Sequence, residues 1–335
     1  MTDALPAGAE PLSVSVVIPV YRGEDTLPGL IDELTALHEV QATPQGRPFR
    51  VSEVLLVWDR GPGRSDHVIR ELAAKHDWVR PVWLSRNFGQ HAATLAGMTS
   101  SGGEWIVTLD EDGQMDPAFI GPMLDTAYDR GAQLVYASPT NPPPHGAIRN
   151  AGSKLAKWFF VKFLADQKFE EFNSYRLVLG EVGRSVAAYT GTGVYLDVAL
   201  SWVVADVATS PVTMRSEGRA AGNYNYGRLF GHFGRLVVSS GTKPLFFVTF
   251  IGIAFVVLGG LAALWVGYQR IIGDLPVSGW ASMFIALMVV GGAVMMSLGI
   301  IAQYIGAATN MSLGKPLYVV VRDPARTFGD DPGIR

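Results

Sequence analysis

The sequence predicts an α/β domain with a mainly parallel sheet covered by helices, followed by a hydrophobic two-helix hairpin. Two observations predict this. In the first two thirds of the 335 residues, short apolar runs rich in β-branched residues alternate with helical patterns, and the last third contains two long segments without a charged residue. Strands that alternate with helices of ten or more residues are typical of sheets with both faces covered.

The predicted strands end in polar residues that could take part in binding or catalysis. The expected strands are residues 12–20, 51–59, 79–85, 104–110 and 132–138, with a helix from Asp25 to His38 after the first. Tyr21, Asp59, Arg86 and Asp110 lie at or just after the ends of the first four strands. Because ligands bind beyond the carboxyl ends of the strands in such sheets, these residues are candidates for one crevice.

Two segments after the last of these strands differ in character. Residues 139–150, which include three consecutive prolines, show no helix or strand pattern and predict a mobile loop. Residues 153–165 mix lysines with Trp158 and three phenylalanines. This pattern fits an interfacial helix on a membrane and a core-packing amphipathic helix equally well.

The C-terminal third predicts two membrane spans. Neither Pro244–Gln269 nor Leu275–Gly314 contains a charged residue, and each exceeds the roughly 20 apolar residues that cross a bilayer. A buried hairpin of a soluble protein is the less favoured alternative at this length. Basic residues flank the hairpin at Arg228, Arg235, Lys243, Lys315, Arg322 and Arg326, against a single Arg270 in the turn. This bias places the N-terminal domain and the tail in the cytoplasm.

The expected organisation follows from these boundaries. It comprises a cytoplasmic domain at 1–227, a juxtamembrane interfacial segment at 228–243, a first span at 244–269, a short extracytoplasmic loop at 270–278, a second span at 279–305 and a cytoplasmic tail at 306–335. The first twelve residues carry acids and prolines, so they do not predict a secretory signal. Glycine pairs at 259–260 and 291–292 allow close helix contacts within the hairpin or between subunits, which leaves a homo-oligomer open.

The composition excludes several classes of function. The net charge is -3 and the sequence pI is near 6.1, so no global basic field favours nucleic acid as a partner. The chain has no cysteine. A disulfide scaffold, a thiolate metal site and a cysteine nucleophile are therefore all excluded.

The candidate metal site is the acidic run at the end of the fourth predicted strand. Asp110 and Asp112 are separated by one residue, so in extended geometry their side chains project to the same side. Carboxylates combined with substrate phosphates suit Mg²⁺ or Mn²⁺, and Gln114 could add a third oxygen. An Asp-x-Asp alone is a weak motif, because acid pairs are common in turns.

Four runs in the same order strengthen this interpretation: SVVIPVYRGEDTLPGL, VWDRGPGRSD, LSRNFGQHAATLAGM and WIVTLDEDGQMDP. Together they resemble family 2 glycosyltransferases of the GT-A fold, and more narrowly the branch that acts on polyprenyl phosphates. FNSYRL, EGRAAGNYNYGRL and the closing GKPLYVVV also have counterparts in that branch, so the resemblance extends over nearly the whole chain.

The resemblance implies roles for individual residues. Pro19, Tyr21 and Glu24 would line the nucleotide pocket, Asp59 would hold the base, Arg86 and Asn87 would lie near the donor, and catalytic Asp110 and Asp112 would carry the metal with Gln114. Without the surrounding motifs, Asp59 is a turn-forming aspartate before Gly61. The role of His91 at the start of the next helix stays open.

The implied reaction is an inverting transfer of a hexose-type sugar from a nucleotide diphosphate donor to a polyprenyl phosphate at the cytoplasmic membrane face. The acceptor phosphate is ionised near neutral pH, so no strong general base is needed. Arg149, Arg176 and Arg219 are the candidates for holding that phosphate, whereas Arg215 fits a juxtamembrane residue near lipid head groups.

Departures from the family pattern leave part of the specificity open. Tyr21-Arg22-Gly23-Glu24 replaces the usual acid-rich turn, and Ser174 stands where relatives often carry Asp. The sugar, the nucleotide base, the polyprenol length and the choice between Mg²⁺ and Mn²⁺ are not determined. A processive polysaccharide synthase is disfavoured because no Gln-x-x-Arg-Trp element is present. A non-catalytic membrane scaffold is disfavoured by the intact acidic run.

Overall fold

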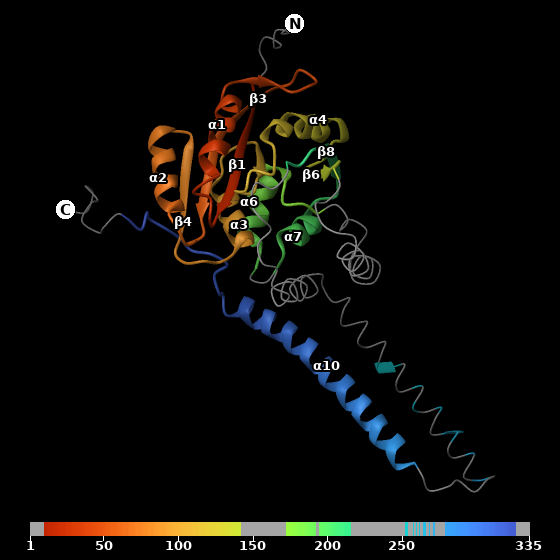
Figure 1. Ribbon diagram of the computed structural model, residues 1–335. Coiled ribbons are helices and arrows are strands. Elements are labelled where there is room, and N and C mark those ends of the chain that lie inside the picture. The colour runs from red at the N-terminus through yellow and green to blue at the C-terminus, as the bar shows by residue number, and fades with distance from the viewer. Residues whose placement is uncertain are drawn as a thin grey trace.

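The computed structural model consists of an α/β domain from which one long helix projects (Figure 1). It describes residues 10–141, 172–191, 194–215 and 279–325, together with scattered positions between 252 and 271. Several predicted features lie outside these residues. They are the helix at 153–165, Arg149, Arg219, the juxtamembrane segment 228–243, and most of the first span and of the loops 139–150 and 270–278.

A nine-stranded mixed sheet forms the centre of the domain, with the order β8-β6-β7-β5-β1-β3-β4-β9 and with β2 paired to β3. Six strands, β1, β3, β4, β5, β6 and β8, run in one direction, whereas β2, β7 and β9 oppose them. The strands are β1 Leu12–Val20, β2 Gln41–Ala42, β3 Pro48–Trp58, β4 Val79–Leu84, β5 Trp105–Thr108, β6 Leu134–Pro139, β7 Arg176–Leu179, β8 Val207–Val212 and β9 Val320–Val321.

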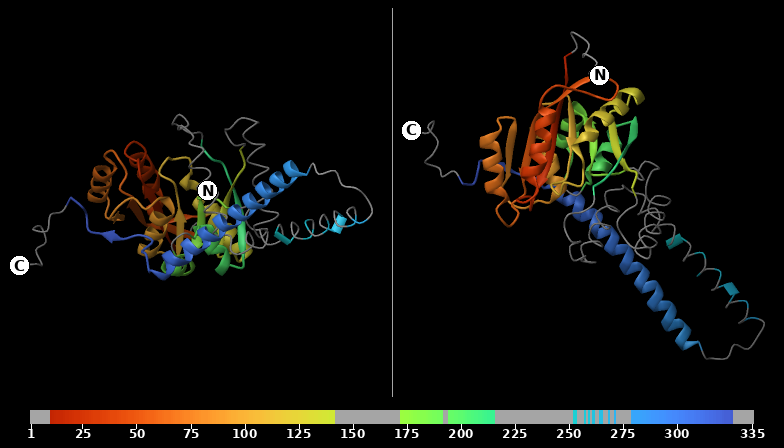
Figure 2. Two further views of the ribbon diagram at one scale, coloured as in Figure 1. Left: turned by 90° about the horizontal axis from the view of Figure 1, so that it is seen from below. Right: turned by 45° about the horizontal axis from the view of Figure 1, so that its top comes forward.

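Helices cover both faces of this sheet, as Figure 2 shows from two further sides. On one face, α1, α2 and α4 pack in one apolar cluster, and on the other face α3, α6 and α7 pack in a second. The helices are α1 Leu27–His38, α2 Ser65–Lys75, α3 Gln90–Ser100, α4 Ile120–Arg130 after the 3₁₀ turn η1 Pro117–Phe119, α6 Gly180–Tyr189, α7 Leu196–Val203 and α10 Trp280–Ser312.

The central strand β1 explains why the core divides into these two clusters. Val14, Val16 and Ile18 point to the cluster with α1, and Val17 points to the cluster with α3, because successive side chains alternate across a strand. All four are fully buried. The strand therefore forms an almost continuous apolar run, as expected when both faces of a parallel sheet are covered.

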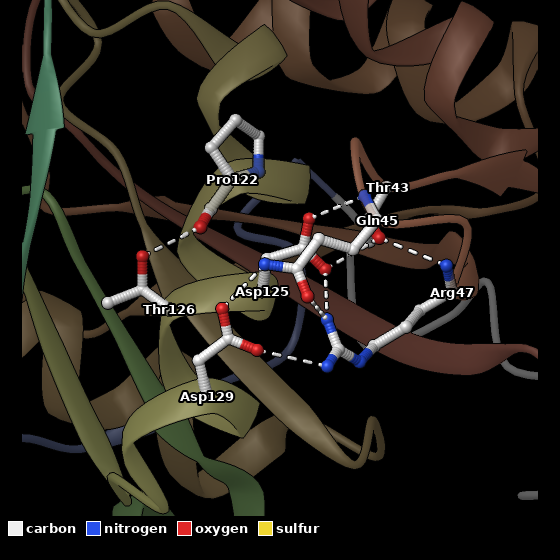
Figure 3. Close-up of polar contacts among 7 residues, drawn as sticks. All are labelled: Thr43, Gln45, Arg47, Pro122, Asp125, Thr126 and Asp129. Atoms are coloured by element: carbon white, nitrogen blue, oxygen red, sulfur yellow. Dashed lines mark hydrogen bonds and ion pairs between the residues drawn. The ribbon is translucent and has the colours of Figure 1, made fainter.

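A polar cluster joins the turn between β2 and β3 to α4 (Figure 3). Thr43 Oγ1 donates to Asp125 Oδ1 at 2.7 Å, and the Gln45 backbone N–H donates to Asp125 Oδ2 at 3.0 Å. The Arg47 guanidinium pairs with Asp125 at 2.6 Å and with Asp129 at 3.1 Å. These contacts fix α4 to the turn before β3, at the N-terminal end of that strand.

The helix α10 contains the stretch Val289–Gly306, which is long and apolar enough to cross a membrane and has no residue buried. Within the part of the chain that the structure describes, it is the one helix of this kind. It coincides with the second predicted span and continues beyond residue 305 to Ser312. Its length and composition are those of a membrane-crossing helix.

The segment after α10 returns to the sheet. β9 pairs antiparallel with β4 at Trp83 and Leu84, and Ser85 N–H donates to the Val319 carbonyl at 3.0 Å. Asp323 then accepts Arg70 Nε and Nη2 at 2.8–3.0 Å. The predicted tail thus contributes an edge strand to the domain.

The α/β architecture and the five predicted strands are confirmed, with end points that differ by a few residues. The predicted helix near Asp25 begins at Leu27. The sequence did not indicate β7, β8 or the two-residue strands β2 and β9. These strands are short or polar, and sheet pairing fixes them instead of a local pattern.

Replacing Asp323 with asparagine tests how β9 is held. Asp323→Asn should lower the free energy of local opening of β9 by about 1–2 kcal/mol, because the bidentate, charge-assisted contact with Arg70 is lost. Amide hydrogen exchange of residues 317–323 in the full-length protein measures this. Asp129→Asn, which loses a contact with Arg47 at the other end of the domain, serves as the control. Unchanged exchange in Asp323→Asn would show that strand pairing alone holds the segment.

Candidate active site

Two adjoining cavities open at the carboxyl ends of β1, β3, β4 and β5. The larger has a volume of about 450 Å³ and the smaller one of about 220 Å³. Pro19, Gln90 and Asp110 line both of them. The larger cavity is also lined by Tyr21, Asp59, Asn87, Gly89, Glu111 and Asp112. The residues at the ends of separate strands therefore do come together.

Asp110 lies at the boundary between the two cavities and is held on both sides. Its Oδ1 accepts Gln90 Nε2 at 2.6 Å, and its Oδ2 accepts Ser174 Oγ at 2.9 Å. Burial raises the pKa of Asp110, and the nearby carboxylate of Asp112 raises it further, while the Ser174 hydrogen bond opposes the shift. The carboxyl group is thus fixed in orientation by neutral donors beside a second acid.

The neighbouring acids Glu111 and Asp112 have different contacts. Asp112 is exposed, and its Oδ1 accepts the backbone N–H of Gln114 at 3.0 Å within the same turn. Glu111 Oε2 accepts the backbone N–H groups of Tyr21 at 2.9 Å and Arg22 at 3.0 Å. Glu111 therefore ties the loop after β5 to the loop after β1.

A third loop, after β3, approaches these two closely. A Cβ on Gly61 would lie 1.6 Å from the Tyr21 carbonyl oxygen, so only glycine fits there. Asp59 accepts the backbone N–H groups of Phe88 at 2.7 Å and Gly89 at 2.8 Å. Burial raises the pKa of Asp59, and these two hydrogen bonds oppose the shift. Asp59 thereby fixes the loop that leads into α3.

The smaller cavity contains a buried ion pair. Arg176 on β7 pairs with Asp197 on α7, and Tyr136 donates to Asp197 Oδ1 at 2.9 Å. Burial opposes the charge of Arg176, but Asp197 and its other neighbours outweigh this and raise the pKa of Arg176. Within the described residues, Arg176 Nε has no hydrogen-bond partner. The cavity wall therefore carries an ion pair, and the Arg176 guanidinium acts electrostatically on Asp110.

His91 also lines the smaller cavity. Its ring meets the Tyr195 ring edge to face, with 4.0 Å between the ring centroids. Thus a residue at the start of α3 packs against one just before α7. This contact gives His91 a packing role at the cavity wall.

The acids at the end of β5 fit part of a divalent cation site. Asp110 and Asp112 offer carboxylate oxygens on one cavity wall, and each oxygen retains a lone pair beyond its hydrogen bond. The described part of the chain contains no group of three or more His, Asp or Glu residues that could hold a metal by itself. Mg²⁺ and Mn²⁺ do not require such a group, since they bind through one or two carboxylates plus substrate phosphates.

The expected site residues separate into three groups. Pro19, Tyr21, Asp59, Asn87, Asp110 and Asp112 line the larger cavity, and Arg176 lines the smaller one. Glu24, Arg86 and Gln114 line neither: Glu24 accepts Ser65 Oγ at 2.6 Å, Arg86 lies over the Phe88 ring at 4.3 Å, and Gln114 uses its backbone to bind Asp112 and Arg215. Arg149 and Arg219 lie outside the described residues.

The sequence does not indicate Gln90 or Tyr195 as site residues, and it indicates Glu111 only as part of the acidic run Asp110-Glu111-Asp112. Glu111 stands between Asp110 and Asp112, and Gln90 precedes His91, for which the sequence suggests no single role. Nothing in the local pattern distinguishes these residues from ordinary loop and helix-start positions. Ser174 was noted as a departure from the family, and this position supplies a donor to Asp110.

Comparison with known proteins identifies the family. The family model described as glycosyl transferase family 2 matches residues 15–182, half of the chain. The bactoprenol glucosyl transferase of Shigella phage SfX is 26% identical over 314 residues, which cover 92% of this chain and 99% of that protein. The undecaprenyl-phosphate 4-deoxy-4-formamido-L-arabinose transferase of Yersinia pestis (strain Pestoides F) is 26% identical over 93% of this chain and 94% of its own length.

Among solved structures, mannosyl-3-phosphoglycerate synthase from Rubrobacter xylanophilus superposes with a TM-score of 0.47 and 17% identity, and covers 68% of this chain and 72% of that one. The family model spans β1 to the start of α6 and includes the acidic run at the end of β5. The chain therefore belongs to glycosyl transferase family 2 and is a glycosyltransferase.

Proposed function

We propose that this glycosyltransferase moves a hexose from a nucleotide diphosphate sugar to a polyprenyl phosphate at the cytoplasmic face of the membrane. One observation carries the proposal. The relatives named for bactoprenol and undecaprenyl phosphate align with more than nine tenths of the chain, so the match includes the apolar C-terminal third. At 26% identity, the sugar and the nucleotide base are not transferred from these relatives.

The larger cavity is the proposed donor site. Asp110 and Asp112 would hold Mg²⁺ or Mn²⁺ together with the donor phosphates, which supply the oxygens that the protein lacks. Such a cation supplies Lewis-acid neutralisation of the charge that develops on the departing nucleotide. Gln90 and Ser174 keep the Asp110 carboxylate oriented, and Tyr21, Asp59 and Asn87 provide the remaining walls.

The smaller cavity is the proposed route for the acceptor phosphate. Arg176 lines it beside Asp110, and Arg149 and Arg219 are further candidates for the same phosphate. A phosphate monoester is already ionised near neutral pH, with a second pKa of about 6, so its oxygen can attack without a strong general base. In-line attack forms the bond from phosphate to the anomeric carbon as the bond to the nucleotide breaks, which inverts that carbon.

A membrane placement completes the proposal. The division at residues 228, 244, 270, 279 and 306 gives two spans with the catalytic domain and both termini in the cytoplasm. The charge-free runs and the flanking basic residues support it. The position of Val289–Gly306 on the exposed helix α10 agrees with the second span.

Loss of the exposed acid tests the catalytic assignment. Asp112→Ala should lower kcat/KM about 100-fold or more, because a cation ligand is worth several kcal/mol to the transition state. The assay offers the purified full-length protein polyprenyl phosphate, Mn²⁺ and a panel of nucleotide sugars, and detects the glycolipid.

The matched control is Asp129→Ala, an acid at the opposite end of the domain. It should leave turnover unchanged. The catalytic proposal is wrong if the wild type consumes no donor, or if the two variants turn over equally fast. Long polysaccharide as the product would favour a processive synthase.

The link between the loops after β1 and β5 gives a second prediction. Glu111→Gln should raise the KM for the donor about tenfold and change kcat less, because the neutral amide has one acceptor oxygen for two N–H groups and puts its N–H₂ group against the Arg22 N–H. Steady-state kinetics with the donor that the nucleotide-sugar panel identifies measure both constants. A KM equal to that of the wild type would show that Glu111 does not control donor binding.

Reporter fusions test the proposed topology. Fusions at residue 274 and at the C-terminus should report opposite sides of the membrane, the first extracytoplasmic and the second cytoplasmic, because the basic residues flank both spans on one side. A fluorescent protein and alkaline phosphatase provide complementary signals. The same side for both fusions would rule out the two-span arrangement.

A further inference from the structure

Arg215 follows β8 and contacts three residues on two separate elements, α1 and the turn after β5. Its Nη1 donates to Glu33 Oε1 and Oε2 on α1 at 2.8 and 3.0 Å. Its Nη2 pairs with Asp116 Oδ1 at 3.0 Å, and its backbone N–H donates to the Gln114 carbonyl at 2.9 Å. The sequence favoured a juxtamembrane residue at lipid head groups here, but the guanidinium is engaged by two carboxylates within the domain.

Both of the loop residues that Arg215 contacts belong to the turn that follows Asp110 and Asp112. The Gln114 N–H donates to Asp112 Oδ1, so the two backbone groups of Gln114 connect Arg215 to Asp112. Asp116 caps η1 by accepting the Ala118 N–H at 2.9 Å. The Asp116 carbonyl accepts the Tyr175 hydroxyl at 2.8 Å.

The remaining contacts of this turn lie on its other side. Gln90 and Ser174 hold Asp110, and Glu111 binds the loop after β1. Arg215 thus holds the C-terminal end of this turn, at Gln114 and Asp116. Its ion pairs are partly exposed, with 39% of the Arg215 side chain and 42% of the Glu33 side chain accessible. Surface pairs of this kind contribute little to overall stability, so their main consequence is local geometry.

We propose that Arg215 is a positioning residue that holds the turn carrying Asp112 in the geometry for binding a divalent cation and donor phosphates. The inference rests on the proposed function of that turn. Arg215 acts through Gln114 and Asp116 and contacts neither cavity. In the sequence it lies four positions before Arg219, a candidate for the acceptor phosphate. One short segment therefore bears on the turn of the donor site and on the proposed acceptor site.

The chain offers a matched control for this role. Arg47 also pairs with two carboxylates, Asp125 and Asp129, and 31% of its side chain is exposed. It immediately precedes β3, and Figure 3 shows its side chain. The cavities open beyond the other end of that strand. Arg47→Gln removes the same type and number of ion pairs away from the cavities.

The experiment compares Arg215→Gln with Arg47→Gln in the full-length protein in lipid nanodiscs. We expect residues 110–116 to exchange their amide hydrogens faster in Arg215→Gln only. Mn²⁺, titrated with inorganic pyrophosphate in place of the donor phosphates and followed by electron paramagnetic resonance, should bind about tenfold more weakly to this variant, as the loss of two partly exposed ion pairs allows. The KM for the donor should rise more than kcat falls, and Arg215→Lys should recover part of the Mn²⁺ affinity.

Equal exchange of residues 110–116 in Arg215→Gln and Arg47→Gln, with equal Mn²⁺ affinity, would overturn the inference while the wild type stays active. Failure of the wild type to consume any donor would instead overturn the proposed function, and the exchange comparison would still test the contact. If Arg215→Gln does not fold, Asp116→Asn replaces it. This change removes the ion pair and keeps an oxygen for the Ala118 N–H, and it should loosen the same turn.

Discussion

The carboxylate of Glu111, bound to the backbone N–H groups of Tyr21 and Arg22, is the contact on which the larger cavity depends. Three consecutive acids at one strand end repel one another, and hydrogen-bond donors to each carboxylate offset that cost. Asp110 uses Gln90 and Ser174, Glu111 uses backbone N–H groups, and Asp112 uses its own turn. Because Glu111 turns toward the neighbouring loop, Asp110 and Asp112 remain on the cavity wall.

The smaller cavity places a buried guanidinium, paired with a carboxylate, beside these acids. Arg176 would be very costly in this position without Asp197, because an unpaired buried charge loses its hydration. Burial and Asp112 raise the pKa of Asp110, and the same guanidinium opposes part of that rise. An anionic ligand entering between the two cavities thus meets Arg176 as well as the acids. The protein therefore needs no net positive charge to bind such a ligand.

Sequence periodicity predicted the strands that place this site, because the polar site residues follow directly where each apolar run ends. Tyr21, Asp59 and Asp110 consequently meet at one cavity. The contacts of Glu24 and Arg86 were not predictable, because each lies in a motif but turns toward Ser65 or Phe88. Likewise β9 has two residues and no periodic pattern, and its pairing depends on the free edge of β4, far away in the sequence.

The C-terminal segments contact the loops of the cavity from two sides. β9 pairs with β4 and binds the backbone of Ser85, just before the loop of Asn87, while Arg215 holds the turn of Asp112. Only residues 313–319 separate α10 from β9, and such a segment spans at most about 25 Å. If α10 crosses the bilayer, the cavities are confined to the neighbourhood of the membrane surface, where the phosphate of a lipid acceptor is located and a soluble acceptor has no advantage.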